Sequence, residues 1–293
     1  MPPLSSRRDV LKALAIGGLV TPLLGQAAGK LDAEQKTAAF KLGIASYSLR
    51  GLSLDAALAA VRRLGLGALS INRAHISWEH AAAGWERVVA KFAPAGVAVR
   101  CCGVVTLPND ETTVRGAFEF ARTLGVALMA CSPEPASLPL VARYAAEYNI
   151  RAAIHNHGPE DKIYPSPHEV WAAVQPYGRH LGLCIDVGHA YRAGADPAEC
   201  IRRYRERLFD VHLKDSAAPV GAEDIPTEIG RGRMDVPGIL TALRESGYDG
   251  TAWFEFEKDA SDPLPGLAES IGFVRGLLRG MGLDAAALNR MIT

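Results

Sequence analysis

The sequence predicts a single α/β domain that folds as one closed (β/α)8 barrel. Short β-branched runs alternate with amphipathic windows of helical spacing from residue 40 to the end of the chain. No linker rich in proline, glycine or serine and no block of charge divides this region. Eight strand–helix units in roughly 250 residues have the length that a closed eightfold barrel requires.

The predicted strands are short runs in which β-branched and other apolar residues predominate. They cover residues 41–47, 67–72, 96–104, 126–131, 150–155, 181–187, 208–214 and 250–256. The competing architecture, an open doubly wound sheet, would place a G-x-G-x-x-G motif after the first strand. Gly43-Ile44-Ala45 leads straight into polar residues instead, so we favour the barrel.

The predicted helices are the windows between these strands, in which apolar residues recur at three- and four-residue spacing. They cover approximately residues 53–64, 79–93, 109–124, 136–148, 167–177, 196–206, 236–246 and 264–280. Three of them begin at a capping residue followed by proline, a pair that favours the first turn of a helix. These pairs are Ser166-Pro167, Asp196-Pro197 and Asp262-Pro263.

The first 27 residues are typical of an export signal. Arg7 and Arg8 precede an apolar stretch from Ala13 to Leu24, and small residues follow as far as Ala28. This arrangement resembles a twin-arginine (Tat) signal. We therefore expect a signal at 1–27, a linker at 28–39 and the barrel at 40–293, in a protein exported to the periplasm or beyond. No stable membrane insertion is expected after cleavage, and an uncleaved anchor or a chance basic segment are the alternatives.

The charge and cysteine counts exclude some classes of partner. The chain has 32 Lys and Arg against 32 Asp and Glu, so it lacks the basic character that nucleic-acid binding requires. A small-molecule partner is expected instead. Five cysteines are an odd count, and most lie in apolar runs, so we expect buried, reduced thiols rather than disulfides. A metal-binding pair at Cys101 and Cys102 is the alternative.

Four successive predicted strands end in residues that can ligate a metal. These residues are His155, Asp186, His212 and Glu255. The carboxyl ends of barrel strands meet at one face, and ionisable side chains gathered there cost several kcal/mol unless they are paired or coordinated. We therefore predict one divalent metal ion, Mn²⁺ first, with Co²⁺ or Zn²⁺ as alternatives. Two imidazoles with two carboxylates suit these ions better than Ca²⁺ or Mg²⁺.

The sequence around these residues resembles the xylose isomerase-like TIM-barrel superfamily of sugar isomerases and epimerases. The resemblance covers roughly residues 40–280. Its motifs are H-N-H-G at 155–158, C-I-D-V-G-H-A at 184–190, V-H-L-K-D at 211–215, E-I-G-R-G-R-M-D at 228–235 and G-Y-D-G-T-A-W-F-E at 247–255. The resemblance implies a metal held by glutamate, aspartate, histidine and glutamate. Asp186, His212 and Glu255 match, whereas His155 stands where the first glutamate is expected.

The histidine at position 155 changes the expected mechanism. In members that resemble ketose epimerases, the two ligand glutamates are also the bases on the two faces of the substrate, and only Glu255 remains here. A single imidazole base, His157 or His189, becomes the preferred interpretation, because imidazole titrates near neutral pH. The alternative role of these two histidines is to support the metal ligands.

Four further residues are predicted to contact the substrate or to orient a group that does. Lys214 and Arg231 offer cationic contacts to substrate oxygens, with surface ion pairs as the alternative. Glu257 is expected to orient one of these cations. His75, which follows the second predicted strand, is a further candidate.

The expected chemistry is removal of a proton beside a sugar carbonyl, with the metal stabilising the oxyanion and no organic cofactor. H-N-H-G-P-E at 155–160, with Tyr164-Pro165, resembles exported members that include lyases of 3-keto-glycosides. We therefore favour elimination from a 3-keto-glycoside. The alternatives are an isomerase or epimerase of an unphosphorylated sugar, hydration or dehydration of a keto sugar, and a metal-bearing sugar-binding protein without turnover. The sequence leaves the oligomeric state and the leaving group open.

Overall fold

The computed structural model describes residues 40–78 and 84–292. The expected export signal at 1–27 and the linker at 28–39 lie outside these residues, as does the start of the helix expected at 79–93. Within the described residues, none of the helices has the length and the apolar character that crossing a bilayer requires.

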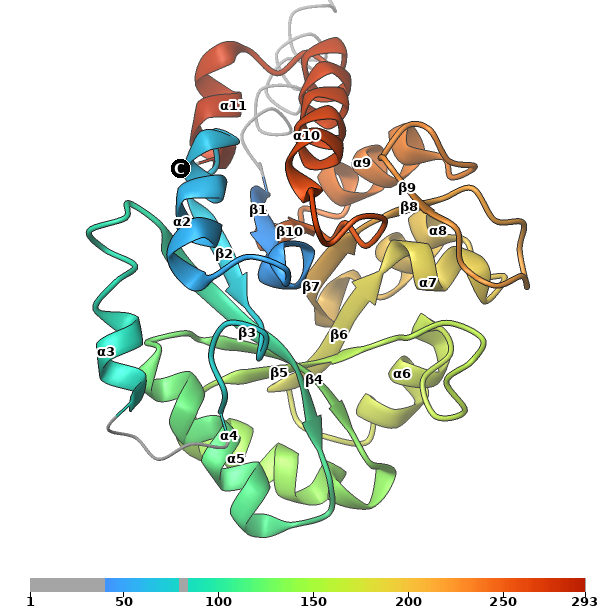
Figure 1. Cartoon of the computed structure of the whole chain (residues 1–293). Helices are drawn as coiled ribbons and strands as arrows, with labels where there is room; N and C mark the ends of the chain where they lie inside the picture. Colours follow the sequence, from blue (N-terminus) through green and yellow to red (C-terminus); the bar gives the residue numbers. More distant parts are fainter. Residues whose placement is uncertain (1–39, 79–83, 293) are drawn as a thin grey trace, which may run out of the picture. The chain divides into compact units, whose positions relative to one another are not determined.

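Eight parallel strands close into a barrel, which confirms the predicted fold class (Figure 1). Each of them overlaps one of the eight predicted runs. They are β1 (Lys41–Ala45), β2 (Ala68–Ile71), β3 (Ala98–Leu107), β4 (Leu128–Pro133), β5 (Arg151–His155), β6 (Leu181–Asp186), β7 (Leu208–Leu213) and β10 (Thr251–Phe254). The first and last of these strands pair with each other, and this pairing closes the ring.

Helices follow the strands at the predicted places. They are α2 (Leu54–Arg63), α3 (Trp85–Val89), α4 (Glu111–Thr123), α5 (Leu138–Tyr148), α6 (Pro167–Val174), α8 (Pro197–Arg203), α9 (Val236–Glu245) and α10 (Pro263–Gly280). Further elements were not predicted, and several of them lie at the carboxyl ends of strands. They are the 3-10 helices η1 (Ser46–Leu49), η3 (Pro135–Ser137) and η4 (Arg205–Arg207), helices α7 (Val187–Arg192) and α11 (Ala285–Ile292), and the hairpin of β8 (Asp215–Ser216) and β9 (Pro226–Thr227).

The predicted caps mark the starts of three helices. Ser166 and Glu169 form a capping box. The Ser166 side chain accepts a hydrogen bond from a backbone N–H of the first turn, and the Glu169 side chain accepts one from the Ser166 backbone N–H. The Asp196 side chain accepts hydrogen bonds from the first backbone N–H groups of α8. Asp262 precedes α10 without a side-chain hydrogen bond to the helix, so Pro263 alone favours that start.

The barrel interior is filled by a few large side chains, such as Trp253 and Phe209, among smaller ones. Trp253 is fully buried there, and its indole N–H donates to Asp210 Oδ1 at 2.6 Å. Gly43 on the neighbouring strand makes this possible, because a Cβ at that position would lie 2.3 Å from the indole ring. All five cysteines are buried and unpaired, as expected, and Cys101 and Cys184 lie in this interior layer.

Candidate metal centre and catalytic cavity

Four side chains from successive strands converge at the carboxyl end of the barrel. His155, Asp186, His212 and Glu255 each offer a ligand atom, and these atoms all lie within 4.8 Å of one another. This is the placement that the strand-end pattern predicted. Strands β5, β6, β7 and β10 are neighbours in the barrel, so the last residues of β5 and β6, the next-to-last residue of β7 and the residue after β10 meet there.

The donor atoms at this point fit a metal ion. His155 Nδ1 and Nε2, Asp186 Oδ2 and His212 Nε2 are buried and form no hydrogen bond with another described residue, although Asp186 Oδ2 lies within ion-pair distance of Lys214. Unpaired polar atoms at such depth cost free energy, and ligation of a cation is one way to offset that cost. Two imidazoles and two carboxylates can hold Mn²⁺, Co²⁺ or Zn²⁺.

The local sequence around Asp186 explains how its carboxylate is aimed. Asp186 ends β6 and caps α7, because its Oδ1 accepts a hydrogen bond from the His189 N–H at 2.8 Å. The side chain of Asn156 exchanges two hydrogen bonds with the Asp186 backbone, at 3.0 and 3.1 Å. Gly188 lets the helix approach β7, since a Cβ there would lie 2.9 Å from Lys214 Cβ. Oδ2 of Asp186 is left to face the cluster.

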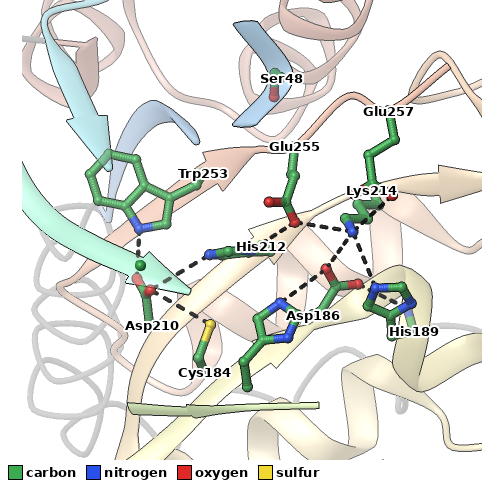
Figure 2. A network of polar contacts seen from close by, with 12 residues as sticks. Ser48, Cys184, Asp186, His189, Asp210, His212, Lys214, Trp253, Glu255 and Glu257 are labelled. Atoms are coloured by element: carbon green, nitrogen blue, oxygen red, sulfur yellow. Dashed lines mark hydrogen bonds and ion pairs between the residues drawn. The ribbon is translucent and has the colours of Figure 1, made fainter. Parts of the chain in front are cut away.

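Lys214 places a buried ammonium group between the acidic side chains (Figure 2). Its Nζ lies 3.0 Å from Glu255 Oε2, 3.1 Å from Asp186 Oδ2 and 3.3 Å from Glu257 Oε2. Burial opposes the charged form, but the three carboxylates outweigh it and hold the pKa of Lys214 well above its ordinary value. The side chain therefore remains a cation and a hydrogen-bond donor.

The same ion pairs set the protonation of the ligands. Burial alone would raise the pKa of Glu255, but Lys214 and His212 lower it, so this carboxylate is ionised. His212 Nδ1 lies 2.8 Å from Glu255 Oε2, and this carboxylate raises the pKa of His212 to about 9 despite burial. Burial lowers the pKa of His155 well below 6.5, so that imidazole is neutral. A metal ion would have to displace the proton from His212.

A cavity of about 250 Å³ opens beside this cluster. Its lining combines the ligands His155 and Glu255 with other candidate site residues. The lining residues are Tyr47, Asn72, Val104, His155, His157, His189, Lys214, Glu255 and Glu257. The structure therefore places six of the ten predicted site residues around one hollow, with Asp186 and His212 in the cluster beside it.

His157 and His189 both reach this cavity but have different partners. His157 Nδ1 lies 3.3 Å from Asp161 Oδ2, an ion-pair distance without hydrogen-bond geometry, since this buried nitrogen has no hydrogen-bond partner among the described residues. His189 Nε2 lies 3.3 Å from Lys214 Nζ, and its Nδ1 lies 3.4 Å from a guanidinium nitrogen of Arg192. Burial and the Lys214 charge lower the pKa of His189 to about 4. Both are neutral, but of the two only His157 has a carboxylate oxygen of a described residue beside a ring nitrogen.

Two predicted contacts lie away from the cavity. Arg231 is exposed and pairs with Glu269, and the glycines on either side of it donate their N–H groups to Asp215 Oδ2 at 2.9 and 3.1 Å. The G-R-G segment is therefore an anchor for the loop that follows β7. His75 is half-buried, and its ring nitrogens lie 3.2 Å from Ser46 Oγ and from the Leu49 carbonyl oxygen. The structure thus does not bring Arg231 or His75 to the metal cluster.

Several residues near the site were missed from the sequence. Asp161 is four residues after His157. Side chains at this spacing lie side by side when the chain between them forms a helical turn. Asp210 lies below the cluster, where its Oδ2 is 3.8 Å from His212 Nε2, and burial raises its pKa. Arg192 is 4% exposed and pairs with Glu160. Of these residues, only Asp161 could have been predicted from the sequence, because it is four residues from His157.

Comparison with known proteins gives both a family and individual relatives. The family model described as "Xylose isomerase-like TIM barrel" matches residues 58–277. The rhizopine catabolism protein MocC of Rhizobium meliloti is 32% identical over 139 residues, 43% of this chain and 42% of that protein. An inosose dehydratase of Geobacillus kaustophilus is 36% identical over 97 residues, 28% of this chain and 32% of the enzyme. The matches thus span less than half the length of these curated relatives.

A solved structure shares the fold at lower identity. The IolI protein with a bound zinc atom has a TM-score of 0.67, with 15% identity over 87% of this chain and 100% of that one. At this identity, the likeness describes the arrangement of the barrel and not its substrate.

Proposed function

Because this chain belongs to the xylose isomerase-like TIM barrel family, we propose that it is a metal-dependent enzyme that eliminates the leaving group of a 3-keto-glycoside. One observation carries this proposal. A neutral imidazole, His157, and an ammonium group, Lys214, line the cavity that His155 and Glu255, two of the four candidate metal ligands, also line. Elimination needs a base for the C–H proton and a proton donor for the departing oxygen, and these two side chains supply them.

His155, Asp186, His212 and Glu255 are the residues that would hold the metal. When bound there, a divalent ion supplies a Lewis acid that stabilises negative charge on the substrate carbonyl oxygen. The remaining chemistry belongs to the side chains around it.

His157 Nε2 takes the proton from C2 of the sugar, next to the C3 ketone, with the Asp161 carboxylate 3.3 Å from Nδ1 of the same ring. The electron pair of the broken C–H bond forms a C1–C2 double bond as the bond from C1 to the glycosidic oxygen breaks. Lys214 donates a proton to that oxygen. The products are an unsaturated keto sugar and a free alcohol, so the reaction requires no oxidant or reductant.

His155 favours this one-base route over epimerisation by two bases. An epimerase that acts on both faces of its substrate needs a second base among the ligands, which in ketose epimerases is a glutamate. Position 155 has an imidazole instead, and burial lowers its pKa, which makes it a weak base. Dehydration of a keto polyol is the second candidate function, favoured by the inosose dehydratase relatives. It uses the same proton abstraction, with water as the leaving group.

Proton NMR of the metal-loaded protein tests the proposal. With methyl 3-keto-β-glucoside, we expect the C1 and C2 proton signals to be replaced by that of a vinyl proton as methanol is released. The matching glucoside without the ketone should be inert, because the C–H bonds of an ordinary glycoside are not acidified. Turnover of glucose, fructose or an inosose, with the keto-glucoside unchanged, would favour isomerisation or dehydration instead. Binding of these sugars without any turnover would identify a sugar-binding protein.

We also propose that the protein is exported by the twin-arginine route, on the basis of Arg7 and Arg8 before the apolar stretch. Replacing both arginines by lysine keeps the charge but removes the pair, so the precursor should remain in the cytoplasm. Fractionation followed by N-terminal sequencing checks this, with cleavage expected near Ala28 in the unaltered protein. Normal export of the double variant would contradict the proposal.

A further inference from the structure

We propose that a second hollow beside the catalytic cavity is a subsite for the leaving group of the substrate, an aromatic aglycone with oxygen atoms on its ring. The inference rests on the proposed elimination and extends it by naming the substrate class. The hollow has a volume of about 280 Å³. Its lining residues are Tyr47, Asn72, Arg73, Ala74, Ser77 and Trp78.

The two hollows are neighbours because they share two lining residues. Tyr47 and Asn72 line both the subsite and the cavity that contains Lys214 and His157. A sugar ring bound at the metal cluster would therefore have this subsite next to it. A leaving group as small as water would not extend into it, whereas an aglycone would.

The loop that forms the subsite is held in place by partly buried hydrogen bonds. The Asn72 N–H donates to Ser46 Oγ at 2.7 Å, and its side-chain amide donates to the Gly103 carbonyl at 3.1 Å. His75 contacts η1 through both ring nitrogens, and Trp85 Nε1 donates to the Ser77 carbonyl at 2.9 Å. The role that the structure assigns to His75 is thus to join this loop to η1. Binding to such a preorganised surface loses little conformational entropy.

The side chains of the subsite fit an aromatic ring that carries oxygen atoms. Tyr47 is 37% exposed, and Trp78 is half-buried with its ring centre 6.1 Å from that of Phe120. Arg73 is exposed, and none of the described residues forms a hydrogen bond or an ion pair with its side chain. Aromatic rings stack with a flat ligand, and a guanidinium group donates only to acceptors. A second sugar ring shares this chemistry, so the test separates the two.

Binding of unoxidised glucosides to the mature, metal-loaded protein tests the subsite without turnover. Calorimetry would compare 4-nitrophenyl β-glucoside, the disaccharide cellobiose and methyl β-glucoside. We expect the aryl glucoside to bind about tenfold more tightly than the methyl glucoside. Arg73→Ala and Trp78→Leu should each remove most of that gain and leave the affinity for the methyl glucoside unchanged. Arg63→Ala, an exposed arginine on α2, is the matched control and should change neither.

The outcomes separate this inference from the proposed function. A gain for cellobiose that exceeds the gain for the aryl glucoside would overturn the aromatic aglycone in favour of a second sugar. Equal affinity for all three glucosides would overturn the subsite. So would tighter binding of the aryl glucoside that both variants retain. Arg73 is exposed, so Arg73→Ala should fold even if Trp78→Leu does not. Failure of the elimination reaction would leave these binding results readable, because they involve no catalysis.

Discussion

Asp186→Ala is expected to lower the affinity of the protein for Mn²⁺ and Zn²⁺ at least about 100-fold, since even residues that only support ligands contribute ~10- to 100-fold. The substitution removes a negative charge and the Oδ2 atom, which lies 3.5 Å from His155 Nε2 and 3.1 Å from Lys214 Nζ. His212→Ala should have an effect of the same order, because it removes another of the four donors. Isothermal calorimetry and metal analysis of the purified variants measure the loss.

A control variant separates loss of a ligand from a general effect of charge. Asp55→Ala removes an exposed carboxylate that pairs with Lys91, so it should bind metal as the unaltered protein does. Thermal unfolding of Asp186→Ala without metal shows whether the barrel still folds. One metal ion per chain with unchanged affinity in a folded Asp186→Ala protein would exclude the site described above.

His157→Ala is expected to reduce turnover of a 3-keto-glycoside by about 10²- to 10⁴-fold while the protein retains its metal. The imidazole is the proposed base, and it does not belong to the four ligands. Asp161→Asn should cause a smaller loss, because it removes only the group that orients the ring. Initial rates measured beside metal content distinguish loss of a base from loss of the metal.

The pH dependence of the rate supplies a second readout. Burial lowers the pKa of His157 below its ordinary value of 6.5. A base must be neutral to act, so the rate should be lost as the pH falls through this lowered pKa, with the acidic limb below pH 6.5. His189→Ala is also expected to lose turnover, through the contact of His189 with Lys214. If His157→Ala and His189→Ala both kept metal and full rate, Glu255 would become the candidate base.

Strand positions and ligand positions were predictable from local pattern. A barrel strand is a short apolar run, and its carboxyl end is marked by the first polar residues that follow, such as His155 and Asp186. Because parallel strands of a closed barrel end at one face, four such ends predict four neighbouring side chains. This argument needs only the order of the strands, and the four side chains do lie together as it predicted.

Loop contacts were not predictable in the same way. Arg231 was predicted to contact the substrate, yet its side chain pairs with Glu269, which is 38 residues further along the chain. His75 follows a strand end, as the ligands do, but its loop packs on η1 and both ring nitrogens are occupied there. The direction of a loop side chain depends on which distant backbone covers it, and no periodicity in the sequence encodes that direction.

The electrostatic state of the site also arises only from folding. Strand alternation places Lys214 on the face of His212, but the three carboxylates that keep Lys214 charged come from β6 and from the residues after β10. The alternating apolar pattern along the chain was sufficient for the barrel and its ligand set, because burial of that pattern drives the fold. The choice of His157 rather than His189 as the proposed base required the tertiary structure, because it depends on whether a carboxylate or a cation lies beside each ring.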